Sequence, residues 1–291
     1  MKFEFICLGT GCPIASPERM GPSHLVEINN TKILIDCGSG VTQRLVQAKI
    51  KSAEIDALII THYHSDHIVD FWQLVVSSWH QGRSKPWNVF TTATTIKHLQ
   101  KQIEAYSDEI KIRISHEQRL SVEGLKINFI ELSEETIHFS DFKIRPFLVD
   151  HEPILPAYGL SFEAFNFHLV FSGDTKSCQS LINAVQGADL LIQEVFVDRE
   201  MNAIPGIRTE KTIEAVKSYH TVPDEISKIA SEGKVKTLML THIVPPSADR
   251  LALVKEINRN YDGTIIIAED LMRFDLINKI LTSYNTTLRI R

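Results

Sequence analysis

One short run of this sequence gathers residue types that bind metal ions. Directly after the apolar residues 57–60, three histidines and one aspartate fall within six positions: His62, His64, Asp66 and His67. His62 and His64 are two positions apart, so in extended backbone their side chains leave on the same side. Imidazole and carboxylate groups together suit zinc, with bonds of about 2.0–2.2 Å. We interpret the run as part of a metal site; the alternative is a helix N-cap at Asp66 beside surface histidines.

Other metal-binding side chains follow three later apolar stretches. The stretches and the side chains after them are residues 142–149 with His151, residues 168–171 with Asp174, and residues 237–241 with His242. Each of these side chains, taken singly, fits an ordinary polar loop residue. Strand ends lead into loops, where functional side chains gather. The repeated placement therefore predicts that these side chains join the first run in one site.

The pattern His-x-His-x-Asp-His, followed by a distant histidine, an aspartate and a final histidine, resembles the metallo-β-lactamase fold superfamily. The resemblance extends over nearly the whole chain, from Leu8-Gly9-Thr10-Gly11 through Ile35-Asp36-Cys37-Gly38 to Thr241-His242. It implies an α/β fold, an αββα sandwich of two mixed β-sheets flanked by helices. In such a sandwich the metal ions lie at one edge, between the sheets.

The resemblance also implies a cofactor, two divalent metal ions per chain, with zinc expected and manganese or iron as alternatives. The ligands that it implies are His62, His64 and His151 for the first ion, Asp66, His67 and His242 for the second, and Asp174 as the bridge between them. Asp36 matches an aspartate that supports the metal-binding loop from behind.

Three stretches most resemble the branch that contains tRNase Z, arylsulfatase-like and phosphodiesterase-like enzymes: Ala157-Tyr158-Gly159, Gln193-Glu194-Val195-Phe196 and Tyr219-His220-Thr221. The resemblance implies that His220 protonates the leaving group and that Glu194 orients its ring. Together with Asp66, these two are the expected catalytic residues. Without the resemblance, they are interpreted as a surface carboxylate and an exposed loop histidine.

Two departures count against tRNA processing. In tRNase Z a long Gly/Pro-rich arm lies between the third metal histidine and the bridging aspartate, whereas here Asp174 follows His151 by only 23 positions. The stretch Ile243-Val244-Pro245-Pro246 also replaces the Ser/Arg/Tyr-type sequence expected after the last histidine. Nucleic acid is accordingly not the expected partner, although the sequence leaves it open.

Strand-like and helix-like runs alternate along the chain without repeats or a linker. Strands are expected over residues 3–8, 24–28, 32–35, 57–60, 126–132, 142–149, 168–171, 190–193, 237–241 and 264–267, and helices over residues 41–48, 68–78, 95–106, 223–231 and 248–258. The strand-rich opening argues against a doubly wound parallel sheet. The order agrees with two mixed sheets in a single domain over residues 1–291.

Composition limits the classes further. The 291 residues include 31 Lys and Arg against 36 Asp and Glu, and the net charge of −5 does not suit a general nucleic-acid binder. No apolar run is long enough to span a membrane, the N-terminus is predicted to be a strand, and the four cysteines fit buried thiols. We therefore expect a cytoplasmic protein, with a homodimer left open.

The expected function is a dinuclear metal-dependent hydrolase. It would cleave a phosphodiester, or a similar sulfate or carboxylic ester, by means of a hydroxide that bridges the two metals. The expected partner is a small-molecule ester. The alternatives are a tRNA 3′-processing endoribonuclease, a lactonase or thioesterase, and a non-catalytic metal or ligand sensor.

Overall fold

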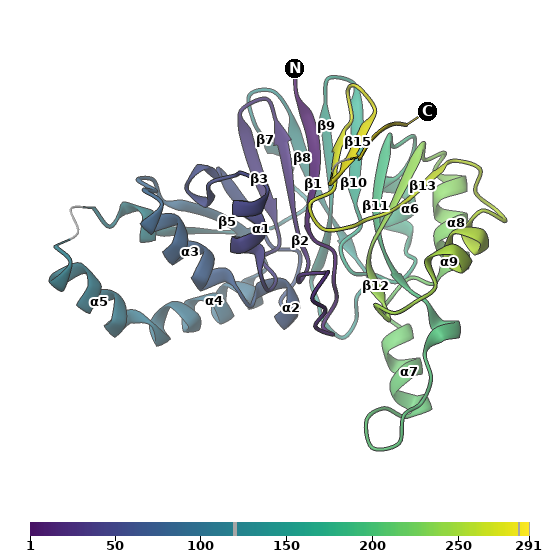
Figure 1. Ribbon diagram of the computed structural model, residues 1–291, viewed down its shortest axis with the longest axis horizontal. Helices are drawn as coiled ribbons and strands as arrows, with labels where there is room; N and C mark the ends of the chain where they lie inside the picture. Colours follow the sequence, from purple (N-terminus) through teal and green to yellow (C-terminus); the bar gives the residue numbers. More distant parts are fainter. Residues whose placement is uncertain (119–120, 285, 291) are drawn as a thin grey trace.

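Two mixed β-sheets form the middle layers of the structure, with helices on both outer sides (Figure 1). The computed structural model describes residues 1–118, 121–284 and 286–290. The first sheet has the strand order β16 (Thr286–Arg289), β15 (Ile280–Ser283), β14 (Arg273–Asp275), β1 (Phe3–Gly9), β2 (Ser23–Ile28), β3 (Thr31–Ile35), β4 (Ala57–Ile59), β5 (Trp87–Thr91) and β6 (Ile127–Glu131). From β3 to β6 its strands run parallel, and the others pair antiparallel.

The second sheet carries most of the later residues of interest. Its order is β13 (Thr264–Ile267), β12 (Thr237–Val244), β11 (Leu190–Phe196), β10 (Phe167–Phe171), β9 (Ala157–Ala164), β8 (Lys143–Val149) and β7 (Ile137–His138). β10 to β13 run parallel, and β8 and β10 both run antiparallel to β9. The carboxyl ends of β8, β10, β11 and β12 therefore meet at one edge of this sheet.

Helices cover the outer face of each sheet. The helices of the first half are α1 (Val41–Gln47), α2 (Ser65–Ile68), α3 (Phe71–His80), α4 (Ala93–Ala105) and α5 (Ser107–His116), and those of the second half are α6 (Gln179–Ala184), α7 (Glu210–Lys217), α8 (Pro223–Glu232) and α9 (Arg250–Ile257). Short 3-10 turns span Ser52–Glu54, Glu123–Leu125 and Asp198–Glu200. In Figure 1, α7 projects from the lower edge of the molecule. The expected αββα sandwich is confirmed.

Strand β1 packs against a different layer on each of its two faces. Phe3, Phe5 and Cys7 face the second sheet, whereas Ile6 and Leu8 face the helices of the first half. A strand buried on both faces needs a continuous apolar run, and the sequence of β1 supplies one. The same alternation along the other strands separates an inter-sheet core from two helix–sheet cores.

The helix predicted over residues 68–78 is interrupted, and the break bears on the site. The structure has two helices there, because α2 ends at Ile68 and α3 begins at Phe71. The backbone N–H of Cys37 donates to the carbonyl of His67 at 2.8 Å, and that of Asp70 donates to the carbonyl of Cys37 at 3.1 Å. These bonds tie the chain to the loop after β3. Asp66 and His67 consequently lie on a short helix of their own.

Three tryptophans contribute to the interior of the first half, since Trp72, Trp79 and Trp87 are all buried. The four cysteines are free, and only Cys178 is partly exposed. Among the described residues, no helix combines the length and the apolar composition needed to cross a bilayer.

Candidate metal centre

The metal-binding side chains predicted from the sequence lie close together. They come from the segments that follow β4, β8 and β10, from helix α2 and from β12. Helix α2, which carries two of them, lies at the lower edge of the sandwich in Figure 1. The two sheets are joined at this edge by a hydrogen bond from the Tyr158 backbone N–H to the Thr61 carbonyl, at 3.2 Å. Strand ends from both sheets thus place the side chains around one point.

His62, His64 and His151 form the first set, which we call the histidine group. Nδ1 of His64 lies 3.0 Å from Nε2 of His62 and 3.1 Å from Nε2 of His151. Three ring nitrogens that converge in this way, without a carboxylate between them, offer their lone pairs to one position. The arrangement fits a tetrahedral metal ion with an additional ligand.

Asp66, His67 and His242 form the second set, which we call the mixed group. Nε2 of His242 lies 3.3 Å from Oδ2 of Asp66, and Nε2 of His67 lies 3.7 Å from the same oxygen. Within the described part of the chain, Nε2 of His67 is buried without a hydrogen bond. A buried ring nitrogen without a hydrogen bond is free to act as a metal ligand, so the mixed group also fits a metal.

His242 reaches the mixed group through a β-bulge. The sequence predicts a strand that ends at Thr241, but β12 continues to Val244. Its register against β11 shifts after Glu194, where Thr241 and then Ile243 face successive residues, so His242 is the extra residue. Its φ of 45° turns its side chain out of the regular alternation. Bulges commonly re-aim side chains beside active sites.

Asp174 connects the two groups. Its Oδ2 lies 3.3 Å from Nε2 of His67, 3.3 Å from Nε2 of His242 and 3.9 Å from Nε2 of His62. One carboxylate oxygen is therefore close to nitrogens of both groups. This is the placement that a bridging ligand needs.

Contacts behind the ligands fix their ring nitrogens. Nδ1 of His67 donates to Asp36 at 2.8 Å, and Nδ1 of His151 donates to the Tyr219 carbonyl at 2.9 Å. Asp36 also accepts from the backbone and the hydroxyl of Thr61, which lies beside His62. Such contacts leave the opposite nitrogen of each ring free for a metal. Asp36 lies where the resemblance implies, behind the ligands.

Burial and charge act differently on the two groups. Burial lowers the pKa of His64 and of His151 to about 4 and that of His62 well below its usual range. Although burial opposes it, the carboxylates of Asp174 and Asp66 raise the pKa of His242 to about 9.

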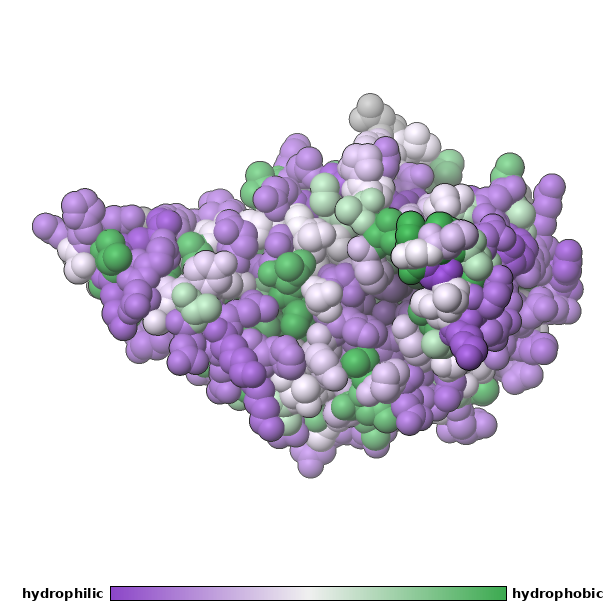
Figure 2. All heavy atoms as spheres, turned by 90° about the horizontal axis from the view of Figure 1, so that it is seen from below, coloured by the Kyte–Doolittle hydropathy of each residue, from purple (hydrophilic) through white to green (hydrophobic). Residues whose placement is uncertain are grey.

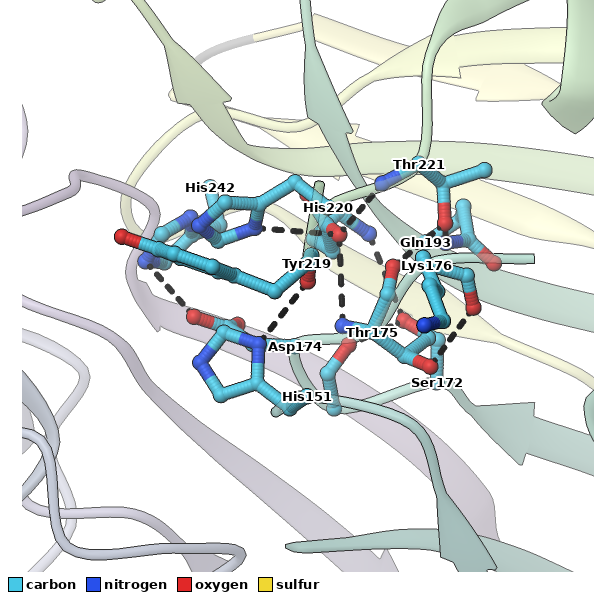
Figure 3. A network of polar contacts seen from close by, with 12 residues as sticks. His151, Ser172, Asp174, Thr175, Lys176, Gln193, Tyr219, His220, Thr221 and His242 are labelled. Carbon is cyan, nitrogen blue, oxygen red and sulfur yellow. Dashed lines mark hydrogen bonds and ion pairs between the residues drawn. The ribbon is translucent and has the colours of Figure 1, made fainter. Parts of the chain in front are cut away.

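Glu194 and His220 lie next to this centre. Both are buried, so the interpretation as surface residues is wrong, and Oε1 of Glu194 lies 3.2 Å from Nδ1 of His220. The same oxygen accepts from the backbone N–H of Thr221 at 3.0 Å and of Thr175 at 3.3 Å (Figure 3). The His220 ring centroid is 5.1 Å from that of His151. Glu194 therefore joins the segment after Asp174 to the segment that carries His220.

Sequence reasoning missed a functional contribution from Tyr219. Its carbonyl holds His151, and its ring lies 5.0 Å from that of His151, at 90°. In the sequence, Tyr219 stands out only as the residue before His220.

The centre opens on the face shown in Figure 2, where the surface is hollowed and apolar and polar side chains alternate around the hollow. On the side of Asp66, a cavity of about 320 Å³ is lined by residues that include Cys12, Met20, Ser39 and Ser65. His64 and Asp66 are partly exposed, whereas His62, His67 and His151 are buried. Solvent therefore reaches the two groups from one side.

Known proteins match this chain over most of its length. A family model described as "Anti-Pycsar protein Apyc1" matches residues 3–243. Ribonuclease Z of Mycobacterium bovis is 31% identical over 249 residues, covering 83% of this chain and 86% of that protein. Ribonuclease Z of Mycolicibacterium gilvum is 31% identical over 279 residues, covering 93% and 95%.

Solved structures share the fold at lower identity. The metallo-β-lactamase fold protein YhfI from Bacillus subtilis aligns with a TM-score of 0.74 and 20% identity, covering 94% of this chain and 100% of its own. Human tRNase Z, short form, aligns with a TM-score of 0.68 and 21% identity, covering 94% and 99%. The resemblance inferred from the histidine motif is confirmed. The chain belongs to the metallo-β-lactamase fold family that includes the anti-Pycsar protein Apyc1 and ribonuclease Z.

Proposed function

We propose that this protein is a hydrolase that uses two divalent metal ions, with zinc as the expected metal, to cleave a phosphodiester or a similar ester. The observation that carries the proposal is the position of Asp174, whose Oδ2 is 3.3 Å from Nε2 of both His67 and His242 and 3.9 Å from Nε2 of His62. Paired metal sites that share a ligand are typical of enzymes that displace groups at phosphorus. The names of its relatives, ribonuclease Z and a diphosphatase of the PhnP family, support hydrolysis.

Each ion has its own set of protein ligands in this proposal. The histidine group would hold one ion and the mixed group the other, and Asp174 would be the ligand that they share. When bound, such ions act as Lewis acids and lower the pKa of water to about 7, which supplies a nucleophile at neutral pH.

The chain's own residues handle the leaving group. Oε1 of Glu194 lies 3.2 Å from Nδ1 of His220, so in this proposal Glu194 orients the ring and Nε2 is the atom left to act on a substrate. His220 donates a proton from Nε2 to the departing oxygen as the ester bond breaks. Burial of both residues keeps bulk water from competing with Glu194 for this ring.

A tRNA 3′-processing endoribonuclease is the second candidate, because the ribonuclease Z relatives are 31% identical to this chain. The connection from His151 to Asp174 weighs against it. That segment consists of a short loop, β9 and β10, and the two strands are joined directly at Phe165 and Asn166. We expect no specific binding of intact tRNA below micromolar concentrations at physiological salt. Sub-micromolar specific binding, or cleavage of precursor tRNA at its 3′ side, favours the second candidate.

A substrate panel with the zinc- or manganese-loaded protein tests the proposal. It comprises bis-p-nitrophenyl phosphate, p-nitrophenyl sulfate, a lactone and a thioester. The proposal expects the highest kcat/KM on the phosphodiester or the sulfate. A clear preference for the lactone or the thioester assigns the site to carboxylic esters instead. Bound metal without turnover of any of them identifies a sensor and contradicts the proposal.

A further inference from the structure

Tyr219 lies next to the histidine group, whereas Asp66 of the mixed group lines the cavity described above. Tyr219 is only partly buried, like His64, whose ring centroid lies 6.5 Å from that of Tyr219. A substrate that reaches the partly exposed His64 would therefore lie close to the Tyr219 side chain.

The Tyr219 ring is held firmly in this position. Its backbone carbonyl accepts the hydrogen bond from Nδ1 of His151, at 2.9 Å. Its ring contacts His151 edge to face and lies 4.8 Å from the ring of His220. In Figure 3 the side chain extends from the His220 segment toward the region of Asp174 and His242. Displacing the ring from the centre would disturb His151 and His220 as well.

The hydroxyl at the end of this ring lacks a protein partner. No hydrogen bond joins it to another of the described residues, whereas the backbone carbonyl of the same residue accepts from His151. The hydroxyl therefore has a hydrogen bond to offer, on a ring that lies beside His151 of the histidine group and His220, the proposed leaving-group acid.

From this geometry we propose that Tyr219 is a substrate-binding catalytic residue, whose hydroxyl donates a hydrogen bond to a non-bridging oxygen of the scissile phosphoryl group. The proposal rests on the proposed function and names the substrate class that suits it, an anionic phosphodiester. A donor at this position favours an anionic oxygen over the neutral carbonyl of a lactone, because hydrogen bonds to charged groups are about twice as strong. Tyr219 would therefore contribute to specificity as well as to rate.

The variant Tyr219→Phe removes the hydroxyl and keeps the ring. We expect it to lower kcat/KM on bis-p-nitrophenyl phosphate about 10- to 100-fold, the range for a lost hydrogen bond to a charged group. The loss on a neutral lactone should be less than threefold, and the metal content should stay unchanged. Tyr106→Phe is the matched control: it removes the same atom from a ring that stacks on Trp72, 6.0 Å between centroids, away from the ligands.

Binding of inorganic phosphate to the metal-loaded protein gives a second readout that needs no turnover. Tyr219→Phe should weaken phosphate binding about 10-fold or more, whereas Tyr106→Phe should not change it. Wild-type values for Tyr219→Phe in both assays would overturn the proposal, and so would equal losses on the phosphodiester and the lactone. If wild-type protein cleaves no phosphodiester, the proposed function fails, and the phosphate measurement still decides whether Tyr219 binds the anion.

Discussion

The histidine group and the mixed group lie at the same edge of the sandwich but differ in charge. Burial keeps the pKa of His64 and His151 near about 4, so at neutral pH these rings are uncharged and ready to bind a metal. The carboxylates around the mixed group raise the pKa of His242 to about 9, so a proton occupies it when no metal is bound. A site of three histidines and a site that includes a carboxylate can therefore differ in how they load their ions.

Asp174 is the residue on which both groups depend, so its loss should have the largest effect. Asp174→Asn keeps the size of the side chain and removes the charge that both groups share. We expect activity to fall to background and the affinity for at least one metal ion to fall by more than about 100-fold. Loss of a residue that only supports a metal ligand typically costs about 10- to 100-fold in affinity, and loss of the ligand itself should cost more. Turnover assays measure the activity, metal titrations measure the affinity, and circular dichroism checks that the variant is folded. A folded variant that keeps most of its turnover would show that the two groups do not share this carboxylate.

A variant of His220 tests the protonation of the leaving group without removing a ligand from either metal-binding group. His220→Ala should lower kcat about 10²- to 10⁴-fold on esters with poor leaving groups, the usual range for general acid catalysis. On nitrophenyl esters, whose leaving group needs no proton, the loss should be much smaller. Glu194→Gln is the companion variant and should show the same pattern more weakly. If kcat falls equally on both kinds of substrate, His220 contributes to substrate binding instead of proton transfer. If the variant loses metal, His220 belongs to the metal site.

The number of protons released on metal binding should differ between the histidine group and the mixed group. Below about pH 9 the His242 ring holds a proton that must leave when a metal binds, so raising the pH toward 9 should strengthen binding at the mixed group. The expected slope is about tenfold in affinity per pH unit for each proton released. The histidine group should bind without this dependence between pH 6 and 9. Calorimetric titrations in buffers of different ionisation enthalpy measure the protons, and a buffer-independent enthalpy for both ions would contradict the distinction.

The sequence predicted which side chains lie together in the candidate metal centre better than it predicted the strands around it. The run His62 to His67 is short and follows an apolar strand, so residue type and spacing are informative without tertiary structure. His242 was expected after its strand, whereas it lies inside β12 at a bulge. A bulge depends on pairing with β11, and no local pattern encodes that pairing.

Other differences have the same origin in tertiary contacts. Glu194 was expected at a strand end, but β11 continues to Phe196 because β12 pairs with it along that length. The helix over residues 68–78 breaks because Cys37, distant in sequence, bonds to the backbone of His67 and Asp70. Strand β9 (Ala157–Ala164) was not predicted as a strand, since its first residues were interpreted only as a motif. The hydrophobic periodicity of one segment carries no information about the distant residues with which that segment pairs.

The metal content of the purified protein tests the central claim most directly. Elemental analysis after mild purification, repeated after incubation with zinc or manganese and removal of the excess, gives the number of ions per chain. Because the histidine group and the mixed group each offer a set of ligands and share Asp174, the account predicts close to two. A value near zero that excess zinc or manganese does not raise would contradict it.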